Sequence, residues 1–266
     1  MRLIEVPASA GYVWFRQGIW LFRRSPFAFL LLLFLYVMVM AMLALVPVAG
    51  AALPFLVTPG MTVGFMLACR SVVSGKPFMP TVLFEAFLTR GATVARRQIA
   101  LGLVYAAAMA LVFASSALGD GGLPVPNMSR TRTPPSPSVL AVPSVLLGLL
   151  IAGALYVPVS MLFWFAPVLC AWHDVPPAKA LFFSIVACWR NRWAFALYGL
   201  LWFALSLVVS GTMAMLLSAL GLGEAALTIA LPVSLVPSTM LYCSFYATYR
   251  GCFGVQETDE PAMPDR

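Results

Sequence analysis

The chain has a single histidine, His173, and Asp174 follows it directly. A histidine beside a carboxylate can do general acid–base catalysis at a membrane surface. Adjacent residues in a turn rarely form a proton relay, however, and no second carboxylate lies near them in the sequence. Asp174 stands before Pro176-Pro177, a pattern typical of a turn and of a cap on the following helix. We therefore predict no catalytic residues, and the sequence also lacks P-loop, HExxH and GxSxG motifs.

The cysteines do not have the spacing of a metal site. The five are Cys69, Cys170, Cys188, Cys243 and Cys252, and no two of them form a CxxC pair. Four lie at ends of apolar segments or in segments expected on the cytoplasmic side, where thiols stay reduced. We interpret them as small apolar residues, with redox or metal chemistry as the alternative, and predict no metal and no cofactor.

Three basic turns offer binding chemistry of another kind. Each contributes two arginines, whose planar guanidinium groups suit phosphate oxygens. The six residues are Arg23, Arg24, Arg96, Arg97, Arg190 and Arg192. We predict that they bind phospholipid headgroups, anionic ones in particular. The alternative is that they only set the orientation of the chain in the membrane.

Three prolines occupy similar places in apolar segments. Pro158 lies in "VPVSMLFW", Pro237 in the closely similar "VPSTMLYCSFY", and Pro59 in "TPGMTVGFMLACR". A proline inside a helix frees a backbone carbonyl and permits a kink. Broken helices at matching repeat positions point to a central binding site, although prolines also simply curve helices, which is the interpretation we favour.

The composition is that of a membrane protein. Of the 266 residues 62% are hydrophobic and 9% charged, the mean hydropathy is +0.96, and a soluble domain is about 25% charged. Spans of about 20 apolar residues cross a bilayer as helices. We predict six, none containing Asp, Glu, Lys or Arg, and expect them to share one bundle. They are about 26–46, 51–69, 98–118, 139–170, 193–220 and 225–249.

The charge distribution orients these spans. Of 16 lysines and arginines, only Arg130 and Arg132 fall in the segment 119–138. The others lie in the N-terminus, in 70–97 and 171–192, and at the C-terminal end. The positive-inside rule then places both termini in the cytoplasm, and we predict a multi-pass protein of the bacterial inner membrane. Without a soluble basic domain, the net charge of +7 does not indicate nucleic-acid binding.

A repeated unit organises the chain. Before each odd span stands a short segment with a basic end: "SAGYVWFRQGIWLFRR", "TVLFEAFLTRGATVARR" and "PAKALFFSIVACWRNR". We interpret these as helices lying in the cytoplasmic interface. The fold class is therefore all-α, with six spans and three interfacial helices in a threefold repeat. One domain covers 1–253, the segment 119–138 reads as a disordered outer loop, and 254–266 as a disordered cytoplasmic tail.

The segment "WFAPVLCAWHDVPPAKALFFSIVACWRNRWAFALYG" resembles an uncharacterised family of six-span inner-membrane proteins of proteobacteria. The N-terminal "VPASAGYVWFRQGIWLFRRSP" and the C-terminal "YCSFYATYRGCF" are similar as well. A looser likeness reaches the membrane domain fused to some glycerophosphodiester phosphodiesterases. That domain is not catalytic, so the resemblance implies a membrane layout, with proximity to lipid metabolism, and no active site.

We therefore expect a non-enzymatic inner-membrane protein with a lipid-associated organising or accessory role and membrane phospholipids as partners. The alternative is a transporter or lipid-translocating protein with a site at the proline-containing spans. A polar cavity at the prolines would favour transport. A solid apolar bundle with basic surface grooves would favour the organising role.

Overall fold

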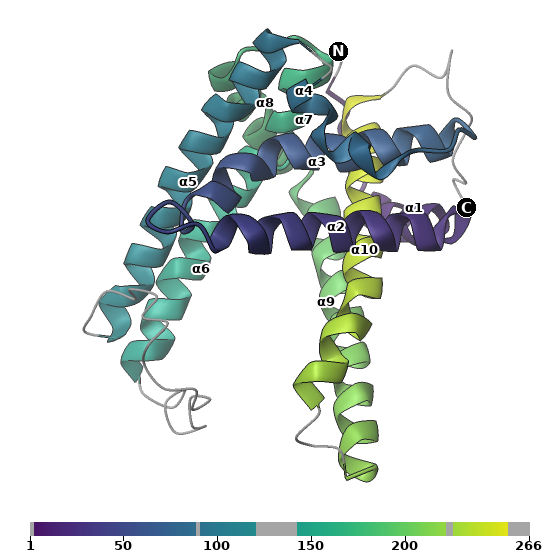
Figure 1. The fold of residues 1–266 in the computed structure, drawn as a ribbon, viewed down its shortest axis with the longest axis vertical. Coiled ribbons are helices and arrows are strands. Elements are labelled where there is room, and N and C mark those ends of the chain that lie inside the picture. Colours follow the sequence, from purple (N-terminus) through teal and green to yellow (C-terminus); the bar gives the residue numbers. More distant parts are fainter. Residues whose placement is uncertain (1–2, 89–90, 121–142, 222–225, 255–266) are drawn as a thin grey trace.

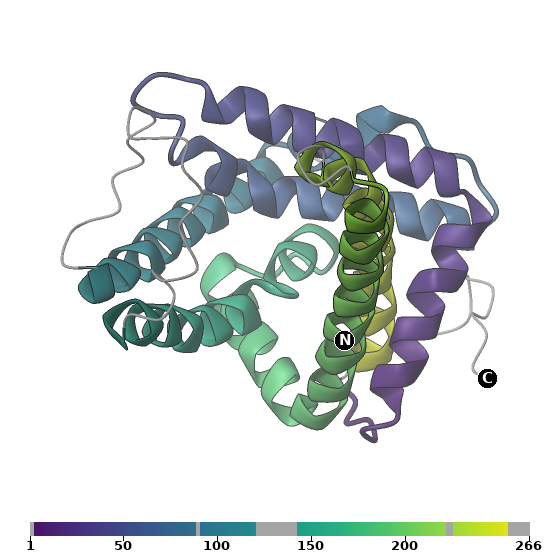
Figure 2. The same ribbon diagram turned by 90° about the horizontal axis from the view of Figure 1, so that it is seen from below.

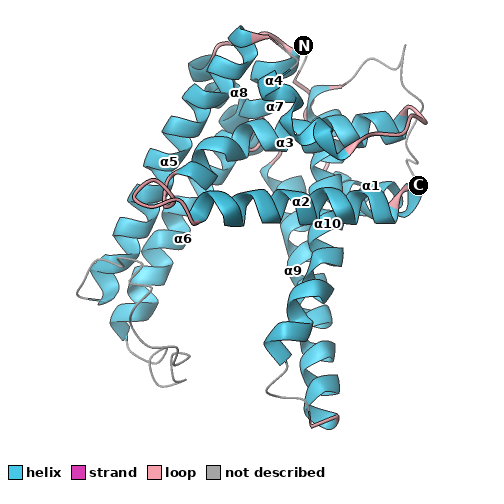
Figure 3. Cartoon of the chain, viewed as in Figure 1, coloured by secondary structure: helices cyan, strands magenta, loops and turns pink. Residues whose placement is uncertain are grey.

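A computed structural model describes residues 3–88, 91–120, 143–221 and 226–254. Within these ranges the chain is helical and contains no strand, as Figure 3 shows, which confirms the all-α prediction. Residues 121–138 of the predicted outer loop and 255–266 of the predicted tail lie outside them. The elements are α1 (Ala10–Arg24), α2 (Pro26–Ala44), α3 (Leu53–Val73), η1 (Pro80–Phe84), α4 (Glu85–Leu88), α5 (Ala92–Asp120), α6 (Pro143–Phe163), α7 (Ala166–Trp172), α8 (Pro177–Arg190), α9 (Arg192–Ala219) and α10 (Ala226–Phe253).

Five segments in the described ranges are long and apolar enough to cross a membrane. They are Pro26–Ala44, Leu53–Val73, Ala92–Ser115, Gly148–Trp172 and Arg192–Ala219. The sixth predicted span, 225–249, coincides with α10, which is not among the five. Serine, threonine and tyrosine are frequent in the described part of α10, and its last turn carries Arg250.

The predicted span 139–170 overlaps the membrane-spanning segment Gly148–Trp172, but it is not one continuous helix. It divides into α6 and α7 at a two-residue turn, Trp164-Phe165. Pro167 explains the break, because it has no N–H to bond the carbonyl of Phe163 and its ring would collide with that carbonyl. Ser184 of α8 fills the gap: its hydroxyl accepts the N–H of Phe165 at 3.0 Å and donates to the carbonyl of Met161 at 2.7 Å.

Two of the three segments predicted as interfacial helices are single helices, namely α1 and α8. The third does not form one helix. Its sequence divides into the 3₁₀ helix η1 and the short α4, and its basic end belongs to α5. Gly91, with a φ of +89°, precedes α5 in the left-handed conformation that glycine tolerates, so the chain changes direction there.

Figure 1 shows three helix pairs, α2 with α3, α5 with α6, and α9 with α10. The pair α2–α3 lies across α9–α10, and Figure 2 shows the same crossing from below. The pair α5–α6 runs obliquely on the other side of the molecule, and the outer halves of α9 and α10 extend beyond the remaining helices. The helices therefore do not form the single bundle expected from the sequence.

The segments that precede the helix pairs join them together. α1 packs mainly on α10 and α9, η1 and α4 pack on α3, and α8 packs on α6 and α7. Gly64 permits the contact with η1, because a Cβ there would lie 2.5 Å from the Cα of Leu83. With Gly60 it forms the GxxxG sequence of α3, which thus serves packing within the chain. The core gathers around these contacts, with Trp14, Leu21 and Tyr246 almost fully buried.

Candidate functional site

A cavity of about 180 Å³ lies where α3, α5, α6, α7 and α10 meet. We call it the tyrosine cavity. Among the described residues that line it, six are aromatic, three carry an aliphatic hydroxyl group and none is charged. These residues are Thr58, Pro59, Thr62, Tyr105, Tyr156, Ser160, Phe163, Trp164, Pro167, Tyr242 and Phe245. The volume holds several water molecules or one small organic molecule.

The aliphatic hydroxyl groups of the cavity donate their protons to the helix backbone. Thr58 and Thr62 on α3 donate to carbonyls four residues earlier, at 2.7 and 2.9 Å, and Ser160 on α6 donates to a carbonyl three residues earlier, at 2.7 Å. With each proton engaged, the oxygens retain lone pairs that accept hydrogen bonds. Pro59 adds an acceptor on the same helix, because it offers no N–H to the carbonyl of Phe55.

Four tyrosines from four helices gather here, Tyr36 of α2, Tyr105 of α5, Tyr156 of α6 and Tyr242 of α10. The rings of Tyr36 and Tyr242 have centroids 5.6 Å apart. The side chain of Tyr242 is hydrogen-bonded to Tyr36 and lies near Tyr105 and Tyr156. Tyr156 is 47% exposed, so it stands at the mouth of the cavity. The spatial arrangement thus concentrates polar groups between helices whose other faces are apolar.

The break between α6 and α7 positions the cavity wall. It turns Trp164 inward, where the indole N–H donates to the hydroxyl of Thr248 at 3.1 Å and the ring lies 4.7 Å from that of Phe245. The fully buried Gln98 of α5 donates its amide to the carbonyl of Pro167 at 2.9 Å. Its Oε1 has no hydrogen-bond partner among the described residues. A buried acceptor without a partner costs free energy. The Oε1 of Gln98 is thus an acceptor near this wall that would gain from a hydrogen-bond donor.

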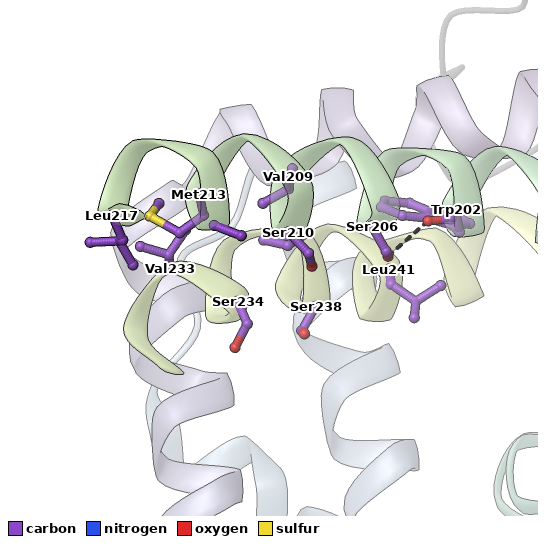
Figure 4. A pocket seen from close by; sticks show the side chains of 12 residues that line it. Trp202, Ser206, Val209, Ser210, Met213, Leu217, Val233, Ser234, Ser238 and Leu241 are labelled. Carbon is purple, nitrogen blue, oxygen red and sulfur yellow. Dashed lines mark hydrogen bonds between the residues drawn. The ribbon is translucent and has the colours of Figure 1, made fainter. Parts of the chain in front are cut away.

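A second cavity, of about 340 Å³, lies between α9 and α10 beside Pro237, and we call it the serine cleft. Figure 4 shows Ser206 and Ser210 on α9 and Ser234 and Ser238 on α10 along this cleft. Ser206 donates to the carbonyl four residues earlier at 2.8 Å, drawn as the dashed line. The other lining residues are Trp202, Val209, Met213, Ala214, Leu217, Val233, Pro237 and Leu241.

The histidine and its neighbour take part in a network at the end of α7. Nε2 of His173 and the hydroxyl of Tyr249 on α10 are 2.6 Å apart. Asp174, with a φ of +56°, forms an ion pair with Arg97 of α5. The N-cap of α8 is Pro176, without a side-chain bond, so the predicted capping role of Asp174 is wrong. Burial lowers the pKa of His173 below its ordinary value of 6.5. The network holds α5, α7 and α10 together and contributes no residue to the lining of either cavity.

Two of the six arginines predicted to bind headgroups are engaged by carboxylates. Arg97 pairs with Asp174, and Nε of Arg190 lies 3.2 Å from Oε1 of Glu5. Both pairs are partly exposed, so water and salt weaken them. They reduce the positive charge that these two arginines offer to a phosphate group.

The remaining arginines lie on the surface at separate places. Arg24 stands 4.6 Å from the ring of Trp20, and Arg192 stands 5.7 and 5.6 Å from the rings of two exposed tryptophans. Arg23 and Arg96 are exposed. In Figure 2 the α1–α2 junction lies at the right and the α8–α9 junction at the bottom, so the structure does not bring the basic turns into one site.

The predicted prolines are inside helices, Pro59 in α3, Pro158 in α6 and Pro237 in α10. Pro59 lines the tyrosine cavity and Pro237 the serine cleft, whereas Pro158 is exposed and lines neither. All five cysteines are free and buried, as expected of small apolar residues. No group of three histidine, cysteine or acidic residues stands together within the described ranges.

Comparison with known proteins places the chain in a family. It is 57% identical over 266 residues to a protein of Burkholderia thailandensis described as a probable inner membrane protein, covering 100% of this chain and 98% of that protein. The chain belongs to this family of inner-membrane proteins. No family model and no solved structure matches it. With five helices that can span a bilayer, this member of the inner-membrane family is a multi-pass integral protein.

The sequence did not point to the tyrosines of this inner-membrane protein. Tyr105, Tyr156 and Tyr242 are spread over nearly 140 residues. Tyr105 and Tyr156 each stand alone in an apolar segment, whereas Tyr246 and Tyr249 follow Tyr242. A usable signal was present in α3, where Thr58 and Thr62 flank Pro59 and place two hydroxyl groups on one helical face. Polar residues at i and i+4 around a proline inside a span mark the face that turns away from lipid.

Proposed function

We propose that this inner-membrane protein is non-enzymatic and that it passes a small molecule across the membrane through the tyrosine cavity. The observation that carries the proposal is the hydroxyl lining of this cavity beside Pro59. In hydrocarbon, polar groups are costly unless they find partners, so polar side chains in spans mark pathways and binding sites. An organising protein has no need of such a cavity and is better served by a solid apolar interior.

The proposed architecture has six spans with both termini in the cytoplasm. The proline positions support a threefold repeat, and so does the packing. Each segment that precedes a helix pair lies on the second helix of another pair: α1 on α10, η1 and α4 on α3, and α8 on α6 and its continuation α7. Repeats of this kind commonly place a site where they meet, and the tyrosine cavity draws on α3, α6 and α10.

A lipid-associated organising role is the second candidate, and the basic turns favour it. Exposed Arg23 and Arg96, with arginine–tryptophan pairs at two of the three turns, suit the headgroup layer of an anionic membrane. The looser resemblance to a membrane domain fused to phosphodiesterases agrees with this role. Because Arg97 and Arg190 already have carboxylate partners, the observation is weaker than the cavity.

Accessibility of the cavity from each side of the membrane tests the proposed transport. We would introduce Thr62→Cys and add a polar, membrane-impermeant maleimide to right-side-out or to inside-out vesicles. The five native cysteines are buried, so the unaltered chain serves as the background control. We expect position 62 to react from both sides, because a pathway must open to each. Reaction from one side only, or from neither, contradicts transport through this cavity.

A further inference from the structure

The tyrosine cavity presents hydrogen-bond acceptors and offers few donors. The protons of Thr58, Thr62 and Ser160 are bound to backbone carbonyls, and the indole N–H of Trp164 is bound to Thr248. Among the described residues of the lining, the tyrosine hydroxyls retain protons to donate, and Tyr242 shares a hydrogen bond with Tyr36. A ligand with hydrogen-bond donors therefore fits the aliphatic hydroxyl groups of this lining.

Aromatic rings make up the rest of the wall and meet at an angle to one another. The centroids of Tyr105 and Phe163 lie 4.8 Å apart with their planes at 56°. Trp164 and Phe245 lie 4.7 Å apart at 60°, and Tyr242 and Phe245 lie 5.4 Å apart at 44°. These rings pack at an angle to one another and not as a flat stack. The face of each ring carries negative partial charge, which attracts a cation placed within about 6 Å of its centre.

Charged residues are absent from the described lining of the cavity. An anion such as a phosphate or a carboxylate would therefore enter without an arginine or lysine to balance it, against oxygen lone pairs and ring faces that repel it. A cation, by contrast, is attracted both by the oxygen lone pairs and by the ring faces. The arginines lie in the basic turns, away from this cavity, so any phosphate chemistry belongs to those turns.

We propose that the tyrosine cavity binds a small ammonium cation, a quaternary ammonium such as choline or a primary amine of similar size. The proposal rests on the transport function proposed above and names its class of substrate. The ring faces hold the charge, and the lone pairs of Thr62 and Ser160 take the hydroxyl or N–H donors. Aromatic walls of this type recognise quaternary ammonium groups without a carboxylate.

A pair of isosteric probes tests the charge directly. Choline and 3,3-dimethylbutan-1-ol have the same shape, but only choline is positively charged. We would measure the binding of each to the purified full-length protein in detergent micelles by calorimetry. We expect choline to bind about tenfold more tightly, because attraction to desolvated rings adds to the shared apolar contacts. Equal affinities, or measurable binding of the neutral alcohol alone, would overturn the proposal.

Variants of Tyr156 separate the ring from its hydroxyl. This residue stands at the mouth of the cavity and is 47% exposed, so its replacement does not disturb the core. We expect Tyr156→Leu to weaken choline binding about fivefold and Tyr156→Phe, which keeps the ring, to weaken it about twofold. Tyr12→Leu is the matched control, because Tyr12 is 50% exposed on α1 and does not line the cavity. Equal losses in the two Tyr156 variants would contradict binding by the rings.

The two proposals fail in different ways. If Thr62→Cys reacts from both sides but choline does not bind, the cavity is a pathway for another class of molecule and the ammonium proposal is wrong. If choline binds but Thr62→Cys reacts from one side only, the cavity is a binding site and transport is wrong.

Discussion

The two ends of the α9–α10 pair differ in what surrounds them. At the inner end of α10, Tyr246, Tyr249 and Cys252 are at most 2% exposed and pack against α1 and its neighbours. Toward the outer end of α9, Leu207 and Met215 are 59% and 76% exposed, and these halves extend beyond the other helices. The same apolar composition is therefore packed on protein at one end and exposed at the other, as expected of a surface that faces lipid.

This difference predicts where the protein resists substitution. In a membrane, lipid tails are as apolar as leucine, so association of helices depends on close packing and on interhelical hydrogen bonds. Close packing and interhelical hydrogen bonds are both found at the inner end. Glycines there allow neighbouring helices to approach closely, and serines form hydrogen bonds between helices. Substitutions there should unfold the protein, whereas equivalent ones in the outer halves should have little effect.

The largest effect is expected where two elements are in closest contact. Gly64→Leu would force a side chain into the backbone of η1, where a Cβ lies 2.5 Å from the Cα of Leu83 and from the carbonyl of Val82. We expect a loss of about 3 kcal/mol in the free energy of unfolding. Gly211→Leu on α9 is the control, since no atom lies within 4 Å of a Cβ there. Melting temperatures in detergent micelles would show the difference, and equal losses would contradict it.

A smaller effect is expected at the break between α6 and α7. Ser184→Ala removes the hydroxyl that bonds the N–H of Phe165 and the carbonyl of Met161, leaving both without that partner in a buried place. The expected loss is about 1–3 kcal/mol. Thr212→Ala, in the exposed outer half of α9, removes a hydroxyl that bonds only its own helix, so its melting temperature should hardly change. Chemical denaturation of both variants measures the two losses. A Ser184→Ala variant as stable as the unaltered chain would show that the break between α6 and α7 does not depend on these hydrogen bonds.

A pH-dependent effect is expected at the end of α7. Burial keeps the pKa of His173 lower in the folded chain than its ordinary 6.5. The unfolded chain then binds the proton more readily, so this contribution to stability is complete above about pH 6.5 and is lost as the pH falls below it. His173→Asn should lose less stability than the unaltered chain between pH 7.5 and 5.5. Parallel melting curves for the two proteins over this range would exclude the effect.

The smallest effect is expected in the outer half of α9. Leu207→Ala removes side-chain contact with lipid more than with protein, and we expect a change below about 0.5 kcal/mol. Leu21→Ala in α1, where the leucine is 1% exposed, should cost about 2–3 kcal/mol. Comparison of their melting curves measures the contrast between the two ends. Similar losses would mean that the outer half also packs on protein.

Sequence reasoning identified the elements better than their arrangement. The apolar run after Ser25-Pro26 predicted α2 almost residue for residue, because span length and a proline at the first helical position are local properties. The break at Pro167 was missed, since the long apolar run 139–170 hid a proline that stands within four residues of its end. The crossing of α2–α3 over α9–α10 depends on contacts between distant segments, which periodicity does not encode.

The candidate site was also predicted only in its local features and not in its tertiary contacts. Pro59 and Pro237 were identified from sequence because both stand at matching positions in repeated strings, and each lines a cavity. The tyrosines were not identified, because a single tyrosine in an apolar span gives no pattern until the fold brings it beside others. The six arginines were predicted to bind headgroups, which stays a prediction. The ion pairs of Arg97 and Arg190 with carboxylates were not predicted, because tertiary contacts determine them.

The central claim is that the tyrosine cavity admits water-soluble cations, whereas the outer half of α9 faces lipid. Labelling of Ser160→Cys and, as the lipid-facing reference, Thr212→Cys tests it most directly, with a trimethylammonium-ethyl and a sulfonatoethyl methanethiosulfonate as cationic and anionic reagents. We predict that Ser160→Cys reacts readily and that its cation-to-anion rate ratio exceeds that of a free thiol by about tenfold. Thr212→Cys should react slowly with both. A ratio at Ser160→Cys equal to that of a free thiol, or a rate as slow as at Thr212→Cys, would contradict the account.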